Sequence, residues 1–460
     1  MPEHNADLVV LGGGSGGYAC ALRAAELGMS VVLVERDKVG GTCLHYGCIP
    51  TKALLHAAEV ADSAREGAKV GVKSSLEGID MAGVNSYKDG VIARLYKGLQ
   101  GLVKSRKITV VEGDGRFEGP NAVTVGGDRY VGKHVVLATG SYARTLPGLD
   151  IGGRIITSYE ALRLEHVPSK VVILGGGVIG VEFASVYSSF GADVTIVEAL
   201  PRLVPNEDEF ASKLLERAFR RRKIAFKTGV KFTGAKQTEE SVTVSLETGE
   251  EIEADLLLVA VGRGPNTASA GFEEAGVKME RGFVLTDERL RTNLPNVYAV
   301  GDIVPGLQLA HRGFAQGIFL AEDLAGLKPA VIDEAGIPRV TYCEPEVASV
   351  GLTEAQARER HGEIQTLTYD LGGNGKSQIL QTQGAIKLVK AGAEGTPGPV
   401  VGIHMVGARV GELIGEAQLV YNWDAQAEDV AALIHAHPTQ NEAFGEAHLA
   451  LAGKPLHSHS

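Results

Sequence analysis

Residues 7–36 read DLVVLGGGSGGYACALRAAELGMSVVLVER. A β-branched apolar run leads into a glycine-rich turn, a segment of helical periodicity and a second apolar run that ends in Glu35, so the stretch predicts a βαβ unit. Gly12, Gly14 and Gly17 form the pattern G-x-G-x-x-G, which permits a tight turn, a close approach of pyrophosphate and close packing of helix on strand. The phosphates would lie at the helix N-terminus, and Glu35 suits the hydroxyls of an adenosine ribose.

The same pattern recurs at 170–199, KVVILGGGVIGVEFASVYSSFGADVTIVEA, with its glycines at Gly175, Gly177 and Gly180. In both copies the first glycine precedes the acidic residue, here Glu198, by 23 residues. One such motif is weak evidence, because a plain glycine turn gives it too, but two copies with matched carboxylates predict an internal duplication and two bound dinucleotides. A carboxylate at this position repels a 2′-phosphate, so Glu198 favours NAD over NADP.

Three further strand-to-glycine stretches follow: VVLATGS (135–141), LLLVAVGRGPN (256–266) and NVYAVGDI (296–303). Continuous apolar runs are typical of strands buried on both faces, and ligands gather at the carboxyl ends of such strands. Each stretch could equally be an ordinary core strand. Asp302 favours a ligand, because a carboxylate directly after a buried strand needs hydrogen-bond partners and a ligand hydroxyl would serve.

The composition limits the function. The chain has 460 residues, 45 basic against 56 acidic, and a net charge of −11, which disfavours nucleic acid or an anionic membrane as partner. The start has no basic leader, and no apolar run reaches the roughly 18 residues that span a bilayer, so we expect a cytoplasmic protein. We expect the basic run RAFRRRKIAF (217–226) to be a solvated helix end, and LHSHS (456–460) to be a disordered tail.

Two of the four cysteines, Cys43 and Cys48, lie close together in GGTCLHYGCIPTK (40–52). Three interpretations are open: a redox-active disulfide, unpaired structural cysteines, or part of a metal site. A tetrahedral zinc site needs two further ligands, which no second cysteine pair supplies, so we predict no metal. A loop of about six residues would gain little from a structural crosslink. Cys20 and Cys343 are isolated and predicted to be buried and inert.

The spacing of the pair has a geometric consequence. In an ideal helix, Cα atoms five residues apart are about 8.6 Å apart, beyond the roughly 7 Å limit for a disulfide. A redox pair therefore requires a broken helical turn. Gly47 supplies backbone freedom, and Pro50 is expected to bias Ile49 away from helix.

Near the C-terminus, HAHPTQNEAFGEA (435–447) places His437 five residues before Glu442. A histidine exchanges a proton near neutral pH, and a carboxylate that accepts its other N–H fixes the tautomer and stabilises the imidazolium. This pair is a candidate acid–base catalyst, while His435 is predicted to be structural.

Together, the GGTC…CIPTK stretch, the second βαβ copy, the AVGD strand and the C-terminal His-Pro resemble the FAD-dependent pyridine nucleotide-disulfide oxidoreductases over essentially the whole chain. The resemblance implies an α/β fold with two Rossmann-like dinucleotide-binding domains, for FAD and NAD, plus a C-terminal α+β dimerisation domain. The implied limits are 1–147 and 269–337 for the FAD domain, 148–268 for the NAD domain and 338–460 for the dimerisation domain.

The resemblance also implies roles. Cys43 would form a mixed disulfide with substrate, and Cys48 would face the flavin as a charge-transfer thiolate. Lys52 would lie near the flavin and pair with Glu182. The histidine–glutamate pair would come from the partner chain of a homodimer. The full set of implied cofactor-binding residues is Gly12, Gly14, Gly17, Glu35, Lys52, Gly115, Thr139, Gly140, Gly175, Gly177, Gly180, Glu182, Glu198, Val230, Gly262, Asp302 and Ala310.

Within the family, LAHRGFAQG (309–317), HAHPTQNEAFGEA and the ending GKPLH (453–457) are most similar to the branch that oxidises protein-bound dihydrolipoamide with NAD⁺. The implied partners are lipoyl domains and the core of 2-oxoacid dehydrogenase complexes. The chain departs from that branch at His45-Tyr46 and Gln440-Asn441, which leaves room for a different disulfide substrate. Two alternatives stay open: a reductase of a low-molecular-weight disulfide, and a docking subunit whose flavin chemistry is vestigial.

Overall fold

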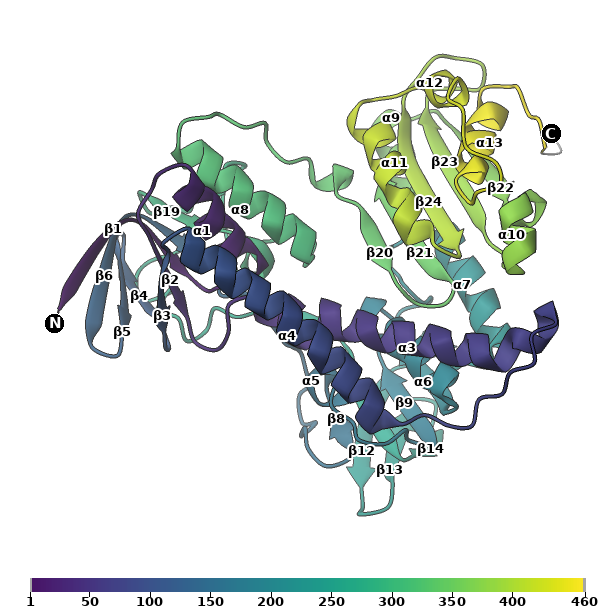
Figure 1. The fold of residues 1–460 in the computed structure, drawn as a ribbon, viewed down its shortest axis with the longest axis horizontal. Coiled ribbons are helices and arrows are strands. Elements are labelled where there is room, and N and C mark those ends of the chain that lie inside the picture. The colour runs from purple at the N-terminus through teal and green to yellow at the C-terminus, as the bar shows by residue number, and fades with distance from the viewer. Residues whose placement is uncertain (1, 458–460) are drawn as a thin grey trace.

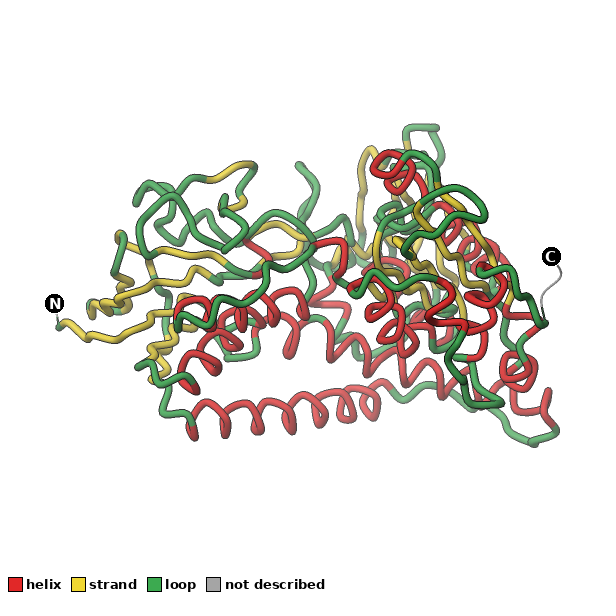
Figure 2. Tube along the Cα trace, turned by 90° about the horizontal axis from the view of Figure 1, so that it is seen from above, coloured by secondary structure: helices red, strands yellow, loops and turns green. Residues whose placement is uncertain are grey.

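The computed structural model describes residues 2–457. Three lobes are visible in Figure 1, each built around its own main sheet, and the two termini lie at opposite ends of the molecule (Figures 1 and 2). Of the predicted tail, residues 458–460 lie outside the described residues.

The first lobe contains a seven-stranded sheet of order β3-β2-β1-β6-β5-β4, with β19 also paired to β6. Pairings among β3, β2, β1, β6 and β19 are parallel, and β4 and β5 form an antiparallel extension. Helices α1, α4 and α8 contribute to the core on one face, and α1 lies beside α8 (Figure 1). Its elements are β1 (Glu3–Leu11), α1 (Ser15–Glu26), β2 (Val31–Glu35), α2 (Gly41–Tyr46), α3 (Cys48–Glu66), α4 (Met81–Ser105), β3 (Thr109–Glu112), β4 (Arg116–Gly119), β5 (Ala122–Val125), β6 (Asp128–Leu137), β19 (Val297–Ala299) and α8 (Ala310–Leu324).

The second lobe contains an all-parallel sheet of order β11-β10-β9-β15-β8 and a three-stranded antiparallel sheet, β12-β13-β14. Helix α3 of the first lobe packs against α6, so the segment that begins at Cys48 joins the two lobes. The elements are β8 (Ile155–Ile156), α5 (Ser158–Ala161), β9 (Lys170–Leu174), α6 (Val178–Phe190), β10 (Asp193–Glu198), α7 (Glu209–Arg221), β11 (Ala225–Thr228), β12 (Phe232–Gln237), β13 (Val242–Leu246), β14 (Glu251–Ala254) and β15 (Leu256–Val259).

The third lobe contains an antiparallel sheet of order β20-β21-β24-β23-β22, whose core is shared with α11 and α13. Two separate antiparallel ribbons, β7–β16 and β17–β18, lie outside the three main sheets. The strands of these two ribbons are β7 (Ser141–Ala143), β16 (Arg263–Pro265), β17 (Met279–Glu280) and β18 (Phe283–Val284). The elements of the third lobe are β20 (Arg339–Thr341), β21 (Glu346–Gly351), α9 (Glu354–His361), β22 (Ile364–Asp370), α10 (Gly375–Leu380), β23 (Ala385–Ala391), β24 (Val400–Gly407), α11 (Val410–Asn422), α12 (Ala427–Ala431) and α13 (Glu442–Leu451).

The predicted fold class is confirmed, and both predicted βαβ units are present, β1-α1-β2 and β9-α6-β10. The three main sheets fall inside the predicted domain limits, whose positions stay predictions. Cys20 and Cys343 are buried, as predicted. In the basic run, α7 ends at Arg221 as expected of a helix end, although Arg222 donates to Asp62 at 3.0 Å.

The expectation for Ile49 is wrong. The helical break lies at Gly47 alone (φ −148°, ψ −102°), and α3 begins at Cys48, so Ile49 and Pro50 are both helical. Pro50 lies in the first turn of α3, where backbone N–H groups have no intrahelical partner, so its missing N–H costs nothing.

Candidate active site

The two cysteines lie on either side of the break between α2 and α3. Cys43 is in α2 and Cys48 is the first residue of α3, and both are free thiols of intermediate burial. The predicted broken turn between them is therefore present. Both thiols line the same cavity, and the pKa of Cys43 is raised whereas that of Cys48 is lowered.

The two cysteines influence each other's protonation. The neighbouring Cys43 thiol stabilises the Cys48 thiolate; burial opposes this and the Lys52 ammonium adds to it, so the pKa of Cys48 falls to about 7. The neighbouring Cys48 and burial raise the pKa of Cys43 well above its usual range. These directions favour a thiolate on Cys48, the residue predicted to face the flavin.

Lys52 follows Cys48 by one helical turn and forms an ion pair with Glu182. Its Nζ lies 3.0 Å and 2.9 Å from the two carboxylate oxygens, and Glu182 is only 3% exposed. Tyr342 of the third lobe completes the group, because its backbone N–H donates to Glu182 Oε1 at 2.9 Å and its ring centroid lies 4.7 Å from Lys52 Nζ. Burial would lower the pKa of Lys52, but Glu182 outweighs it and the pKa is raised.

The first glycine turn has the shape of a phosphate cradle. A Cβ on Gly12 would lie 2.2 Å from the carbonyl oxygen of Ala138, and one on Gly17 would lie 1.8 Å from that of Gly12, so these glycines allow close packing. A Cβ on Gly14 would meet nothing within 4 Å. The turn therefore leaves open space beside the N-terminus of α1, where a pyrophosphate fits.

The second turn repeats this arrangement. A Cβ on Gly175 would lie 2.3 Å from the carbonyl oxygen of Ala260, and a Cβ on Gly180 would lie 1.9 Å from the carbonyl oxygen of Gly175. A Cβ on Gly177 would meet nothing within 4 Å. Both turns thus fit a dinucleotide by the same geometric test.

The two carboxylates also match. Glu35 Oε2 accepts the N–H of Gly13 at 2.6 Å, and Glu198 Oε2 accepts that of Gly176 at 2.6 Å. The other oxygens accept N–H groups of Asp37 at 2.9 Å and Leu200 at 2.7 Å, respectively. Each carboxylate oxygen retains further acceptor capacity for a ribose hydroxyl.

One cavity of about 1520 Å³ runs past both turns and the cysteine pair. The predicted site residues that line it are Gly14, Cys43, Cys48, Lys52, Gly140, Gly175, Gly177, Glu182, Glu198, Val230, Gly262, Asp302 and Ala310. Six predicted cofactor residues do not line this cavity: Gly12, Gly17, Glu35, Gly115, Thr139 and Gly180. Gly115 is a packing glycine, because a Cβ there would lie 2.4 Å from Leu11 Cδ1.

Polar groups at the ends of the first-lobe strands indicate a ligand-binding site. The Ser141 hydroxyl donates to Asp302 Oδ2 at 2.5 Å and accepts a hydrogen bond from Arg263 Nε at 2.7 Å, so Asp302 has a partner within the protein. The Thr139 hydroxyl is buried without a hydrogen-bond partner among residues 2–457. An orphaned polar atom beside a dinucleotide cradle fits a bound flavin.

The histidine–glutamate pair is formed but lies elsewhere. His437 Nδ1 is 2.7 Å from Glu442 Oε1, and Glu442 Oε2 accepts the N–H of Thr439 at 2.7 Å. Burial would raise the pKa of Glu442, but these two partners lower it overall. His437 is 78% exposed and lines no part of the cavity, so a single chain does not bring it to the cysteines. His435 pairs instead with Glu416 at 2.9 Å.

His45 and Tyr46, the first of the two pairs that depart from the family pattern, have structural partners. His45 Nε2 lies 3.1 Å from the Val39 carbonyl oxygen, and the Tyr46 hydroxyl donates to Asp37 at 2.5 Å. Tyr46 also packs against Tyr159 of the second lobe, with ring centroids 5.8 Å apart. Both residues attach α2 to its surroundings, and Tyr46 also lines the cavity that contains Cys43 and Cys48.

Sequence reasoning missed Tyr342, Ser141 and Arg263. Tyr342 is 160 residues from Glu182, and no periodicity links them. Among residues 2–457, no cluster of three or more histidine, cysteine or acidic side chains could hold a metal ion, and none of their helices has the length and apolar character that crossing a membrane requires.

Two family models match the chain. The model described as pyridine nucleotide-disulphide oxidoreductase covers residues 6–317, and that of the family's dimerisation domain covers residues 337–448. The chain therefore belongs to the pyridine nucleotide-disulphide oxidoreductase family, and it is an oxidoreductase that uses FAD and NAD.

Similar proteins of known name indicate the branch of the family to which the chain is most similar. The chain is 39% identical to a dihydrolipoyl dehydrogenase of Bacillus subtilis, over 98% of this chain and 99% of the relative, and 39% identical to the mitochondrial dihydrolipoyl dehydrogenase of Pisum sativum, over 98% and 92%. The predicted branch of the family is thereby confirmed. Two solved structures share the fold: LpdA of Mycobacterium tuberculosis (TM-score 0.90, 23% identity, 98% and 100% covered) and the flavoprotein disulfide reductase RclA of Escherichia coli (TM-score 0.87, 27% identity, 97% and 99%).

Proposed function

We propose that this protein oxidises protein-bound dihydrolipoamide to lipoamide and reduces NAD⁺, as the flavoprotein of 2-oxoacid dehydrogenase complexes. The observation that carries the proposal is the cavity that holds Cys43, Cys48 and the open faces of both glycine turns. A thiol exchange site and two dinucleotide cradles within one cavity suit the transfer of an electron pair from a dithiol to NAD⁺.

The cysteine pair supplies the thiol chemistry. In its disulfide form, a substrate thiolate attacks the Cys43 sulfur, a mixed disulfide forms and Cys48 leaves as a thiolate. The second substrate thiolate then attacks the substrate sulfur, which closes the lipoamide disulfide and frees the Cys43 thiol. The substrate loses two electrons and the cysteine pair gains them. A leaving thiolate of low pKa departs readily, and the pKa of Cys48 at about 7 suits this role.

FAD held at the first glycine turn would supply the two-electron chemistry that links the cysteine pair to NAD⁺. The chain's own contribution is to hold charge beside that cofactor: Lys52, fixed between Glu182 and the Tyr342 ring, places a cation one helical turn from the Cys48 thiolate. The Lys52 cation would stabilise the Cys48 thiolate and any negative charge that develops on a bound flavin ring.

His437 is proposed as the base that takes protons from the substrate dithiol. Its Nδ1 faces Glu442, which leaves Nε2 to accept a proton. Because His437 is remote from the cavity of its own chain, we propose that it serves the cysteine pair of the partner subunit. The matched dimerisation domain supports a homodimer, and a two-fold dimer would then contain two shared sites.

We further propose lipoyl domains and the core of a 2-oxoacid dehydrogenase complex as partners, and the cytoplasm as the compartment. The cysteine pair must cycle through its dithiol form, which the reducing cytoplasm permits.

The experiment that tests the function is steady-state turnover of the FAD-loaded protein with NAD⁺ and with NADP⁺, each against dihydrolipoamide and a panel of other dithiols and thiols. We expect dihydrolipoamide with NAD⁺ to give the highest kcat/KM. Faster turnover of a low-molecular-weight thiol would replace the proposal with a reductase of that disulfide.

The shared site is tested by complementation. Cys43→Ser and His437→Ala chains are each expected to be inactive as homodimers, while their co-expression restores about one active site in four by random pairing. No recovery from mixed dimers would place the base and the thiol in the same chain.

A further inference from the structure

The second glycine turn rests on the loop between β10 and α7, residues 199–208. Ala199, Leu200, Pro205, Asn206 and Glu207 of this loop line the cavity beside Glu198. In its middle, the Val204 N–H donates to the carbonyl oxygen of Gly176 at 2.8 Å. The position of Val204 therefore sets the position of the turn that is proposed to hold the NAD pyrophosphate.

Val204 has an unfavourable backbone conformation. Its φ is +43°, although it is β-branched, and it is 3% exposed. A β-branched residue at positive φ is a genuine outlier, and such strain persists only where the surroundings enforce it. In the first copy the equivalent bond runs from the Gly40 N–H to the Gly13 carbonyl oxygen, also at 2.8 Å, and Gly40 takes its φ of +109° without a side-chain penalty.

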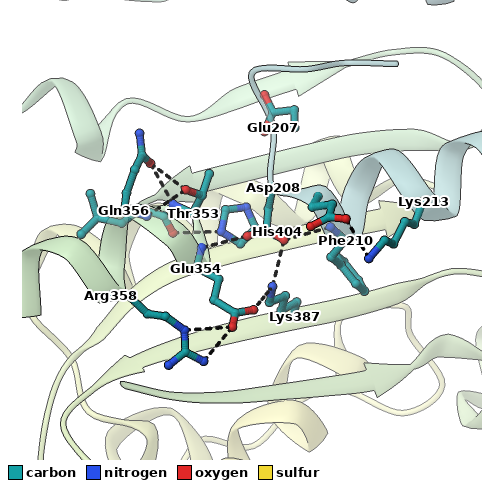
Figure 3. Close-up of polar contacts among 12 residues, drawn as sticks. Glu207, Asp208, Phe210, Lys213, Thr353, Glu354, Gln356, Arg358, Lys387 and His404 are labelled. Carbon is teal, nitrogen blue, oxygen red and sulfur yellow. Dashed lines mark hydrogen bonds and ion pairs between the residues drawn. The ribbon is translucent and has the colours of Figure 1, made fainter. Parts of the chain in front are cut away.

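The loop is held at its far end by the third lobe (Figure 3). Asp208 is the N-cap of α7, where its Oδ1 accepts the Phe210 N–H at 3.0 Å. Its Oδ2 accepts the N–H of Glu354, the first residue of α9, at 2.8 Å. One carboxylate thus joins the N-termini of two helices from different lobes.

Lys387 of β23 neutralises this junction. Its Nζ lies 2.9 Å from Asp208 Oδ1 and 2.7 Å from Glu354 Oε2, and the residue is 7% exposed. Burial would raise the pKa of Asp208, but His404, the Glu354 N–H and Lys387 outweigh it and lower the pKa to about 2. Glu354 also pairs with Arg358 at 2.8 Å and its side chain is 34% exposed, so the buried Asp208 is the carboxylate that would be left without a cationic partner if Lys387 were removed.

Glu207 makes a second attachment to the same lobe. Its carboxylate pairs with Arg339 Nε at 3.2 Å and accepts the Ser349 hydroxyl. We refer to Glu207, Asp208, Arg339, Glu354 and Lys387 together as the Asp208 anchor.

We propose that Lys387 is a positioning residue for NAD: through the Asp208 anchor, the dimerisation domain holds loop 199–208, and with it the second glycine turn, in the shape that binds the dinucleotide. The proposal rests on the proposed function in placing NAD at the second turn. Lys387 acts through Asp208, since it does not line the cavity itself.

The test uses the FAD-loaded protein and the variant Lys387→Met. NADH binding, followed as the concentration dependence of anaerobic flavin reduction by NADH, should weaken at least tenfold, while flavin reduction by dihydrolipoamide changes less than about twofold. Because NADH acts without a dithiol, this arm remains valid if dihydrolipoamide is not the substrate. Lys213→Met is the matched control, because Lys213 lies on α7 and pairs with Glu209 at 2.9 Å where both side chains are more than half exposed.

A second readout is hydrogen exchange of the Val204 amide without nucleotide. The exchange should accelerate in Lys387→Met and be slowed again in part by the added change Glu354→Gln, which removes one of the two carboxylates that Lys387 contacts. If Lys387→Met does not fold, Ser349→Ala, which removes one bond to Glu207, should give the same selective weakening at smaller size. Unchanged NADH binding in a folded variant, or equal loss in both half-reactions, would overturn the proposal and leave the anchor a purely structural feature.

Discussion

The two glycine turns are near copies, yet they are held in place differently. In both turns a glutamate accepts hydrogen bonds from two backbone N–H groups. The carbonyl oxygen of Gly13 in the first turn, and of Gly176 in the second, accepts a hydrogen bond from a backbone N–H of the loop that follows. In the first copy that donor is Gly40, and the chain continues into α2 and Cys43. In the second it is Val204, and the chain continues to Asp208 and the third lobe.

The difference shows how a duplicated element acquires two tasks. The first turn is stable by its own local sequence, because glycine tolerates the required φ, and its loop delivers a reactive thiol. The second turn is fixed by contacts with another lobe, where Lys387 and Arg339 hold Glu207 and Asp208. A dinucleotide site that depends on a neighbouring domain can respond to that domain; one that depends on its own glycines cannot.

The largest expected effect separates the thiol chemistry next to the first glycine turn from nucleotide binding at the second turn. Cys48→Ser should lower dihydrolipoamide-dependent NAD⁺ reduction by at least about 10³-fold, because loss of a residue that acts in the covalent steps removes most of the catalysis. Anaerobic flavin reduction by NADH should persist, since the second turn is untouched. Loss of both would mean that the cysteine pair also organises the nucleotide site.

The reduced cysteine pair should make stability depend on pH. The pKa of Cys48 is lowered in the folded protein from an ordinary value of 9.0 to about 7. Between these values the unfolded chain binds the additional proton, so folding stability due to this group rises with pH, is complete above about pH 9 and is lost as pH falls through 7. Urea unfolding of the reduced protein against Cys48→Ser should show the difference growing by about 2 kcal/mol from pH 7 to pH 9. A flat difference would contradict a thiolate on Cys48.

Matched alanines test the two cradles. Gly177→Ala places a Cβ in the open face of the second turn and should weaken NADH binding roughly tenfold, equivalent to about 1.4 kcal/mol, with FAD retained. Gly14→Ala should instead reduce FAD retention after dialysis. If either substitution affected the other cofactor, the assignment of one turn to each dinucleotide would be wrong.

The last prediction concerns the two backbone N–H donors, Gly40 and Val204, and its smallest effect is at Val204. Gly40→Ala should destabilise the protein by about 1–2 kcal/mol, because its φ of +109° disfavours any side chain and the new Cβ would lie 2.6 Å from Leu44 Cδ2. Val204→Gly relieves a similar strain but loses a buried side chain, so the free energy of unfolding should change by less than about 1 kcal/mol. Thermal unfolding measures both. A larger loss at Val204 than at Gly40 would argue against strain in the second loop.

Much of the fold follows from short-range sequence patterns. Glycine spacing, apolar runs and the repeated 23-residue interval predict both βαβ units, and the spacing of Cys43 and Cys48 predicts the break that the structure places at Gly47. The prediction for Ile49 is wrong because the restriction on the residue before a proline is a preference, and Ile49 is helical in the first turn of α3 despite it.

The rest depends on long-range contacts. Tyr342 meets Glu182 across 160 residues, and Lys387 meets Asp208 across 179. The positive φ of Val204 has no signal in its own sequence, since valine ordinarily avoids that conformation. Such features follow from how the lobes pack, which local patterns do not encode.

The most direct test of the account is an anaerobic titration of the FAD-loaded protein with dihydrolipoamide, followed by addition of NAD⁺ or NADP⁺. The account predicts a long-wavelength charge-transfer band from the Cys48 thiolate after one equivalent of dithiol, and its rapid loss on adding NAD⁺ but not NADP⁺. Flavin that stays oxidised with dihydrolipoamide, or a reduced enzyme that NADP⁺ reoxidises as fast as NAD⁺, would contradict it.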